Sequence, residues 1–403
     1  MINIKDKADC CGCNSCIQVC PRHCIATKTD KEGFAYPVVE SFRCIDCGLC
    51  ERVCPILNQN VTRVPVKTYA AKNPNETIRS KSSSGGIFTL LAEIVIVQGG
   101  VLFGARFDED WNVIHDFTET LEGVAAFCGS KYVQSRIGDS YRRVEKFLKA
   151  GRKVLFSGTP CQVAGLKRFL RKEYDNLLIV DFVCHGVPSP KVWQMYLNET
   201  IARQGDGKNT VLSHSKSFSY RVKGIDFRSK STGWKKYSFA LTLSEASADG
   251  EENTVLLSSI FEKNPYMQAF LSDLTLRPSC YHCSAKSGKS GSDITIGDFW
   301  GIENVRPELD DDKGVSLVMV HSDKGAEALR QSSAVLEEMS YESALTGNRS
   351  ISESVKVPLN RGVFFWRMHR SGKMLDSLAA VQNNSLFARV KRVLYRNIMK
   401  NQF

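Results

Sequence analysis

Eight cysteines near the N-terminus fall into two copies of one spacing. In each copy three cysteines stand three positions apart, the fourth follows four positions later, and a proline comes next. The copies are Cys10, Cys13, Cys16, Cys20 with Pro21, and Cys44, Cys47, Cys50, Cys54 with Pro55. Four thiols thus fall within eleven residues, twice.

The spacing C-x2-C-x2-C-x3-C-P is that of bacterial two-cluster ferredoxins. Three thiolates of one run bind a 4Fe-4S cluster, and the fourth binds the cluster of the other run. Structural zinc sites would instead show cysteine pairs separated by a long insert. The pattern predicts an electron carrier with a first cluster on Cys10, Cys13, Cys16 and Cys54, and a second cluster on Cys44, Cys47, Cys50 and Cys20.

Fifteen cysteines in 403 residues would suggest disulfides only in a short secreted chain. No apolar signal segment precedes Cys10, and the chain is long enough to bury ordinary cores. We therefore expect a cytoplasmic protein whose thiols bind metal.

An apolar stretch at residues 87–105 is the candidate for a membrane span. Glu93, Gln98 and the pair Gly99 and Gly100 interrupt it, so it falls short of the roughly 20 apolar residues that a bilayer needs. We expect a buried helix and no transmembrane segment.

The formal charge of +11 is partly offset by the negative clusters. Since the basic residues are dispersed, we expect no nucleic-acid partner and set a cluster-containing redox sensor aside.

The chain divides into a ferredoxin module at residues 1–62, a larger body at 63–335 and a basic helical extension at 336–403. Apolar periodicity in the body predicts helices and strands in alternation. Helices are expected at 86–98, 139–149, 162–172 and after Pro190, and strands at 101–107, 153–156, 177–183, 293–297 and 315–320, with a hairpin at 224–243. This alternation predicts an α+β ferredoxin module followed by a larger α/β domain with a mixed sheet.

Four further cysteines lie in the body. Cys161 and Cys184 follow predicted strands, and Cys280 and Cys283 form a C-x2-C pair. Strand ends along one edge of a sheet gather loops into a common crevice, so these thiols could bind a third cluster. Buried, inert thiols are the alternative. The neighbouring histidines, His185 and His282, are expected to hydrogen-bond around such a site rather than to bind metal.

Three cysteines remain without an assignment. Cys11, Cys24 and Cys128 are expected to be buried thiols. Cys11 could replace Cys10 as a ligand if the first loop shifted by one residue.

The body resembles the family of coenzyme F420 hydrogenase/dehydrogenase beta subunits, which also includes hydroxymethyl-chlorophyll reductase. The motifs that carry the resemblance begin at Lys81 (KSSSGGIFT), Gly129 (GSKYVQS), Gly158 (GTPCQ), Cys184 (CHGVPS), Cys280 (CYHC) and Gly297 (GDFWG). The resemblance implies one FAD in the body and electron transfer between it and the ferredoxin module. It also implies a third 4Fe-4S cluster on Cys161, Cys184, Cys280 and Cys283.

Several residues are candidates for flavin contacts. Ser82, Ser83, Ser84, Gly85 and Gly86 open a predicted helix, where free N–H groups suit a phosphate, although a simple serine-rich cap is the alternative. Lys131 could stabilise the reduced flavin ring or lie in solvent. Thr159 and Asp298 follow strands and could hydrogen-bond the ring, while Asp298 could equally cap a turn. The chain has neither a dinucleotide fingerprint nor a P-loop.

The tail combines apolar and basic residues at 363–370 and 386–399. It is expected to pack as helices with a basic face, with contact to an anionic membrane or an acidic partner as the alternative.

The whole chain is predicted to be an iron-sulfur flavoprotein oxidoreductase that exchanges electrons with a protein such as ferredoxin and acts on a small molecule. Relatives of this length suggest bacterial surface-polysaccharide synthesis. A non-catalytic electron-transfer subunit that serves a partner enzyme is the other interpretation.

Overall fold

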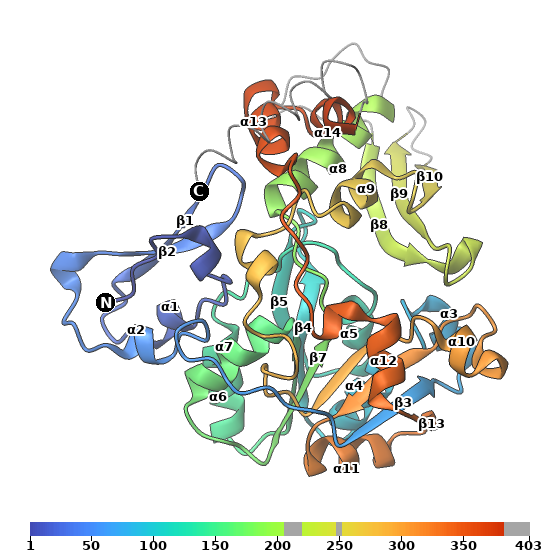
Figure 1. Cartoon of the computed structure of the whole chain (residues 1–403), viewed down its shortest axis with the longest axis horizontal. Helices are drawn as coiled ribbons and strands as arrows, with labels where there is room; N and C mark the ends of the chain where they lie inside the picture. The colour runs from blue at the N-terminus through green and yellow to red at the C-terminus, as the bar shows by residue number, and fades with distance from the viewer. Residues whose placement is uncertain (205–219, 247–251, 383–403) are drawn as a thin grey trace.

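A computed structural model describes residues 1–204, 220–246 and 252–382. The ferredoxin module lies to one side of the body (Figure 1). In it, the antiparallel pair β1 (Ile25–Thr29) and β2 (Ala35–Val39) accompanies the short helices α1 (Ser15–Val19) and α2 (Leu49–Arg52). Both helices begin after a residue in the left-handed region, Asn14 at φ 61° and Gly48 at φ 69°. The repeat in the sequence is therefore also a repeat in the backbone, as expected of an α+β module.

An eight-stranded mixed sheet forms the centre of the body, which confirms the predicted fold class. Five strands run parallel to one another, namely β3, β11, β7, β6 and β4, while β13, β12 and β5 run antiparallel to their neighbours. Their order is β13 (Val335–Met339), β3 (Lys67–Lys72), β12 (Ser316–Val320), β11 (Ile294–Asp298), β7 (Leu177–Phe182), β6 (Val154–Gly158), β4 (Val101–Phe107) and β5 (Val113–Thr118). Strands β6 and β12 are buried along their whole length, as expected of apolar runs covered on both faces.

Helices cover both faces of this sheet. One face carries α4 (Ile87–Val97), α5 (Leu121–Val124) and α11 (Asp323–Gln331), whose apolar residues join the core around Leu155 and Val180. The other face carries α6 (Ser140–Lys149) and α7 (Pro160–Leu170), and beside them α10 (Ile302–Val305) and α12 (Tyr341–Gly347). Helix α3 (Glu76–Lys81) precedes α4.

An upper layer lies beyond the ends of the strands (Figure 1). It contains the antiparallel sheet β8 (Tyr220–Ser229), β9 (Ser238–Ala246) and β10 (Glu252–Ile260), with helices α8 (Pro190–Gln204), α9 (Pro265–Leu271), α13 (Arg361–Ser371) and α14 (Met374–Gln382). Its core is aromatic, with Trp193 5.1 Å from both Phe227 and Tyr266 between ring centroids. Phe107, at the end of β4, packs against this core and so joins the layer to the main sheet.

The expected elements of the body form with small changes at their ends. Helix α7 begins at Pro160 rather than at residue 162, because Thr159 and Gln162 form a reciprocal capping box and proline suits the first helical position. The helix expected at 86–98 forms as α4, which is buried on one side. No helix in the described parts of the chain is long and apolar enough to cross a membrane.

The C-terminal part is less separate than the predicted boundary at residue 336 suggested. That boundary falls inside β13, which pairs with β3. Phe364 and Met368 of α13 are buried in the core of the upper layer. The predicted helix at 386–399 lies outside the described residues.

Candidate iron-sulfur and flavin sites

The candidate residues of the body meet at the edge where the parallel strands end. Gly158 of β6 pairs with Asp181 of β7, and Cys161 and Cys184 each follow three residues later. Ile296 of β11 pairs with Phe182, so Asp298 ends its strand beside the loop of Cys184. The sheet register therefore brings these positions to one edge, as expected for ligand-binding residues in α/β folds.

The larger cavity at this edge is lined by all four cysteines of the predicted third cluster. Cys161, Cys184, Cys280 and Cys283 lie on its wall together with Cys11. It encloses about 820 Å³, including its open mouth. Burial raises the pKa of the Cys280 thiol to about 12, so thiolates in this cavity require a cationic centre such as iron. The lining thus fits a cluster.

A smaller cavity lies in the ferredoxin module. Its wall includes the four predicted ligands of the second cluster and one further thiol, which are Cys20, Cys44, Cys47, Cys50 and Cys24. The backbone N–H of Ile2 donates to Cys50 Sγ at 3.3 Å, and that of Asp46 to Cys44 Sγ at 3.4 Å. Backbone donors of this kind tune cluster potentials. Cys47 is exposed, so this site lies at the protein surface.

The four predicted ligands of the first cluster are electrostatic neighbours. The pKa of the Cys16 thiol is raised by burial and, to a smaller extent, by the thiolates of Cys13, Cys10 and Cys54 and by that of Cys50 from the second site. Cys11 lies within hydrogen-bonding reach of Cys13 and Cys161. The substitution of Cys11 for Cys10 as a ligand stays an open alternative.

None of the fifteen cysteines, all of which are described, forms a disulfide. Among the described residues no group of histidine, cysteine and acidic side chains is spaced to hold a single metal ion.

The predicted first and third cluster sites lie side by side. Ser15 donates from Oγ to the carbonyl of Gly165 in α7 at 2.8 Å, four residues after Cys161. Gly165 is required there, since a Cβ at this position would lie 2.8 Å from Cβ of Cys13. Cys11 stands between Cys13 and Cys161. The second site, with its exposed Cys47, faces the outside.

The serine-glycine segment lies beside Asp298 at the same edge. The Gly85 N–H donates to Ser316 Oγ at 2.9 Å, and Ser316 pairs with Asp298 between the strands. A Cβ on Gly85 would lie 2.4 Å from the carbonyl oxygen of Ala71, so only glycine fits.

The serine hydroxyls of this segment have partners within the protein. Ser82 Oγ donates to the carbonyl of Ile78 at 2.7 Å, and Ser84 Oγ to that of Val315 at 3.0 Å. Ser83 Oγ accepts from the N–H of Ser130 at 2.8 Å. Gly86 caps α4 at φ 84°, and no side chain caps the start of this helix.

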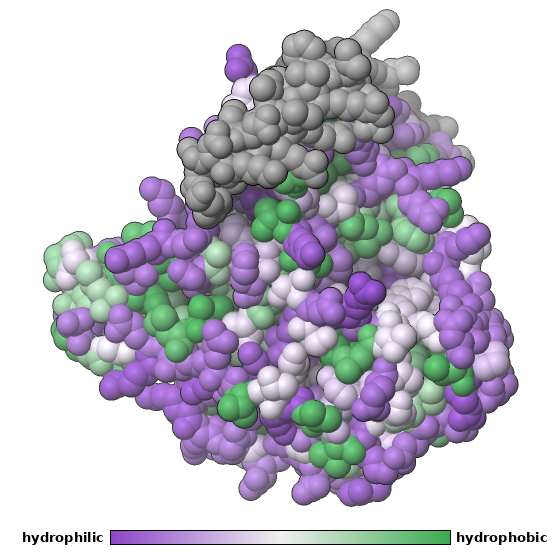
Figure 2. Space-filling view, in the orientation of Figure 1, coloured by the Kyte–Doolittle hydropathy of each residue, from purple (hydrophilic) through white to green (hydrophobic). Residues whose placement is uncertain are grey.

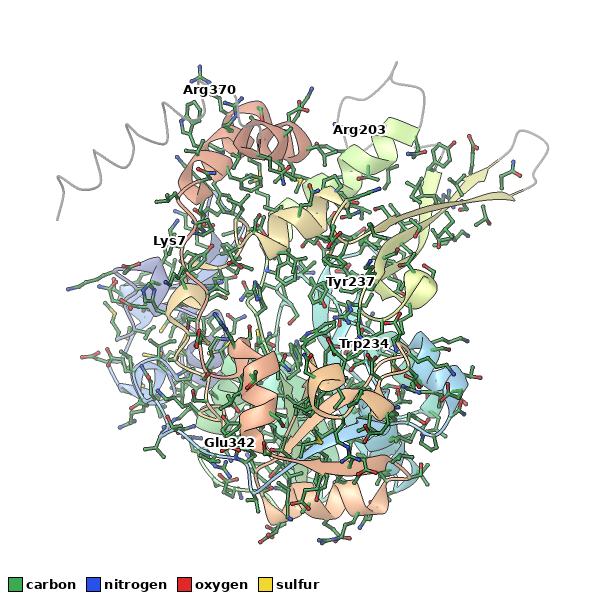
Figure 3. The ribbon with its side chains drawn as sticks, turned by 45° about the vertical axis from the view of Figure 1, so that its right-hand side comes forward. Lys7, Arg203, Trp234, Tyr237, Glu342 and Arg370 are labelled. Atoms are coloured by element: carbon green, nitrogen blue, oxygen red, sulfur yellow. The ribbon has the colours of Figure 1, made fainter. Side chains whose placement is uncertain are left out.

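A buried arginine occupies the space between this segment and Asp298. Arg228, 4% exposed, donates to Asp298 at 2.8 and 3.2 Å and to the carbonyl of Ser83 at 3.2 Å. Trp234 Nε1 donates to the same carboxylate at 2.7 Å, and Tyr237 stacks 4.0 Å from the guanidinium. Figure 3 shows both aromatic residues between the upper layer and the main sheet.

One atom of this cluster is left without a partner. Arg228 Nε is buried and forms no hydrogen bond. Buried donors are nearly always paired, so the unpaired Nε is a candidate contact for an acceptor atom. Lys131, one residue from Ser130, adds a second cation whose pKa burial lowers to about 8. This combination fits an anionic ligand of the flavin type.

The two remaining candidates have other contacts. Thr159 Oγ1 lies 3.2 Å from Cys161 Sγ, which places its hydroxyl at the third-cluster site. Its backbone N–H donates to Gln162. His185 lies on the cavity wall and pairs with Asp273 at 2.6 Å, whereas His282 is exposed.

Sequence reasoning missed Arg228 and Trp234. Strand β8 was expected to alternate between buried and exposed positions, but Phe227 and Arg228 are both buried. An arginine directly after a core phenylalanine in a strand was the available signal.

Two family models match the chain, each over the part described above. Residues 9–57 match the 4Fe-4S dicluster domain, and residues 151–343 match the C terminus of the coenzyme F420 hydrogenase/dehydrogenase beta subunit. The chain thus carries the C-terminal domain of this beta-subunit family in its body, with a 4Fe-4S dicluster domain in front of it. It is an iron-sulfur electron-transfer protein.

Curated proteins are similar to the larger body and to the ferredoxin module of this chain. One subunit of the F(420)H(2) dehydrogenase of Methanosarcina mazei is 25% identical over 194 residues, 43% of this chain and 53% of that protein. The chain thus spans about half the length of this relative. Ferredoxin 7Fe of Hydrogenibacillus schlegelii is 39% identical over 62 residues, 15% of this chain and 73% of that protein.

A solved structure is also similar at low level. A chain of the F420-reducing [NiFe] hydrogenase complex from Methanosarcina barkeri aligns over 79% of this chain and 91% of its own length, with 16% identity and a TM-score of 0.41.

Proposed function

We propose that this protein is an oxidoreductase in which three 4Fe-4S clusters form one electron path to an FAD in the body. The observation that carries the proposal is the larger cavity, where Cys161, Cys184, Cys280 and Cys283 meet at the edge of the sheet. Beside it, the first-cluster loop reaches Cys161 through Cys11. The exposed Cys47 marks the outer end of the path and the edge of the sheet its inner end.

The flavin, when bound, would exchange single electrons with the clusters and two electrons with an organic substrate. Arg228 would bind its acceptor atoms through the free Nε, and Asp298 holds Arg228 in place. Lys131 would supply positive charge beside the ring. Gly85 allows the backbone of the cradle to approach the sheet closely.

The substrate is proposed to be a small organic molecule. A role in surface-polysaccharide synthesis stays a prediction from the resemblance. We further propose that the protein works in the cytoplasm, where reduced thiols and iron supply are available.

The proposed protein partner is a one-electron carrier that binds at the second cluster. Exposed apolar side chains lie close to Cys47 in the chain, with Phe42 85% and Ile45 60% exposed. Figure 2 shows apolar residues gathered over this module. Exposed apolar groups in such numbers favour a protein interaction site.

Iron and acid-released flavin per chain, measured after anaerobic purification, test the proposal. We expect about twelve irons and one FAD. Cys161→Ser should lose about four irons, whereas Cys11→Ser, which changes another thiol on the same cavity wall, should keep all of them. About eight irons without flavin, or the opposite behaviour of the two variants, would contradict the proposal.

A substrate test separates an enzyme from a protein that only transfers electrons. The reduced protein is mixed with candidate substrates and its flavin and cluster absorbance is followed. Reoxidation by an organic substrate alone supports an enzyme. Activity with artificial dyes but with no metabolite would instead indicate that a partner protein holds the substrate site.

A further inference from the structure

We infer that Arg277 is a positioning residue of the first cluster, which it holds against the third-cluster loop and whose reduction potential it raises. This inference rests on the proposed function, because it requires clusters at both sites. Arg277 was not among the candidate residues from the sequence. It precedes the 3-10 turn Pro278–His282, which carries Cys280.

Arg277 is directed at the first-cluster loop. Its side chain is 1% exposed. Nε donates to the carbonyl of Cys10 at 2.6 Å, and Nη2 lies 3.6 Å from Cys10 Sγ. Nη2 also donates to the carbonyl of Ala35 at 3.0 Å. One guanidinium thus contacts both the backbone and the thiol of a cluster ligand.

The surroundings fix the orientation of this guanidinium. Nη1 donates to Gln134 Oε1 at 3.0 Å, and Gln134 donates in turn to the carbonyl of Cys11 at 3.1 Å. The ring of Tyr36 lies 4.4 Å from the guanidinium. Gly12 leaves room for both partners, since a Cβ there would lie 2.8 Å from Arg277 and from Gln134. The loop is therefore shaped around the arginine.

The charge of Arg277 needs a counter-charge. No carboxylate in the described parts of the chain forms an ion pair with it, and all of its contacts are to carbonyls, an amide, a thiol and rings. A buried cation without a partner is costly. A cluster with four thiolates carries negative charge and supplies the missing partner.

This pairing predicts the sign of the effect on potential. Reduction adds a negative charge to the cluster, and a fixed cation close to a ligand sulfur stabilises the reduced form. Removing the cation should therefore make the first cluster harder to reduce.

A redox titration of the whole reconstituted protein, followed by electron paramagnetic resonance, tests the inference. Arg277→Gln should shift one cluster step to more negative potential. We expect a change of at least tenfold in the ratio of reduced to oxidised cluster, which is about 59 mV for one electron. The other steps, and the iron and FAD contents, should stay as in the wild type.

Arg361→Gln is the matched control. Arg361 also joins the body to the ferredoxin module. It donates to Glu32 of the module at 2.9 Å and to the carbonyl of Leu276 of the body at 2.9 Å, but it contacts no cysteine. Equal shifts in the two variants would mean a general effect of docking and would overturn the inference. So would an unchanged potential in Arg277→Gln with its iron retained.

Arg277→Lys covers the case in which the glutamine variant loses the first cluster. If lysine retains that cluster near the wild-type potential, positive charge is what the site requires and the inference holds. Loss of about four irons in the lysine variant as well would overturn it. Failure of the proposed function is recognised separately, because the wild type itself would then lack clusters or flavin.

Discussion

Removing the charge of Asp298 should destabilise the protein strongly, because it leaves Arg228 buried and unpaired. Asp298→Asn preserves the size of the side chain and its ability to accept from Trp234. The side chains of the pair are 15% and 4% exposed. Their direct contact at 2.8 Å corresponds to an attraction of about 6 kcal/mol at an effective dielectric constant of about 20.

The expected loss is smaller than that attraction, because the asparagine oxygen still accepts one hydrogen bond. Breaking one side of a buried pair costs about 3–5 kcal/mol. We expect a decrease of this size in the free energy of unfolding of the Asp298→Asn variant, together with a lower FAD content. Denaturant unfolding followed by tryptophan fluorescence measures the first, provided that the slope with denaturant is unchanged.

Glu338→Gln is the control for this measurement. Glu338 pairs with Lys67 across β13 and β3 at 2.5 Å, but the two side chains are 58% and 47% exposed. Solvent screens such a pair, so the variant should unfold at the same denaturant concentration as the wild type. Removing both charges of the buried pair, in Arg228→Gln with Asp298→Asn, should cost less than Asp298→Asn alone. Equal effects of Glu338→Gln and Asp298→Asn would refute the reasoning.

Three further predictions concern other parts of the chain. Gly85→Ala should abolish FAD binding while iron content stays unchanged, because its Cβ would lie 2.4 Å from a backbone oxygen; retained FAD would contradict this. Phe42→Asp should slow reduction by a ferredoxin several-fold but not by dithionite, and the similarly exposed Val61→Asp is the control. Burial lowers the pKa of His115 to about 4, against 6.5 when unfolded. As the pH falls from about 7.5 to about 5.5, His115 takes up a proton in the unfolded state but not in the folded state. The free energy of unfolding of the wild type should therefore fall by about 1 kcal/mol more than that of His115→Gln. Parallel curves of unfolding free energy against pH for the two proteins would contradict this.

The sequence predicted what depends on local pattern. The runs at 154–156, 177–180 and 317–320 are continuous stretches of buried apolar residues, and they lie in central strands of the sheet. Each ferredoxin cysteine run could also be recognised locally, because its four cysteines lie within eleven residues. Strand β10 was missed because polar residues interrupt its alternation.

Contacts between distant residues could not be predicted in this way. Arg277 and Cys10 are 267 positions apart, and neither segment shows that it will meet the other. Arg228 depends on a strand whose inner and outer positions do not alternate. These arginines therefore emerge only from the three-dimensional packing.

The two clusters of the ferredoxin module differ in surroundings although their sequence runs are alike. The first site is fixed to the body by Ser15, Gln134 and Arg277, whereas the second is left with an exposed cysteine and apolar neighbours. The two cysteine runs have the same spacing, and their sites differ because different parts of the protein pack against them. The inner site gains a cation that favours its reduction, while the outer site keeps access to a partner. Electrons that enter from outside would then move toward the body because of the packing, with no difference needed in the cysteine spacing itself.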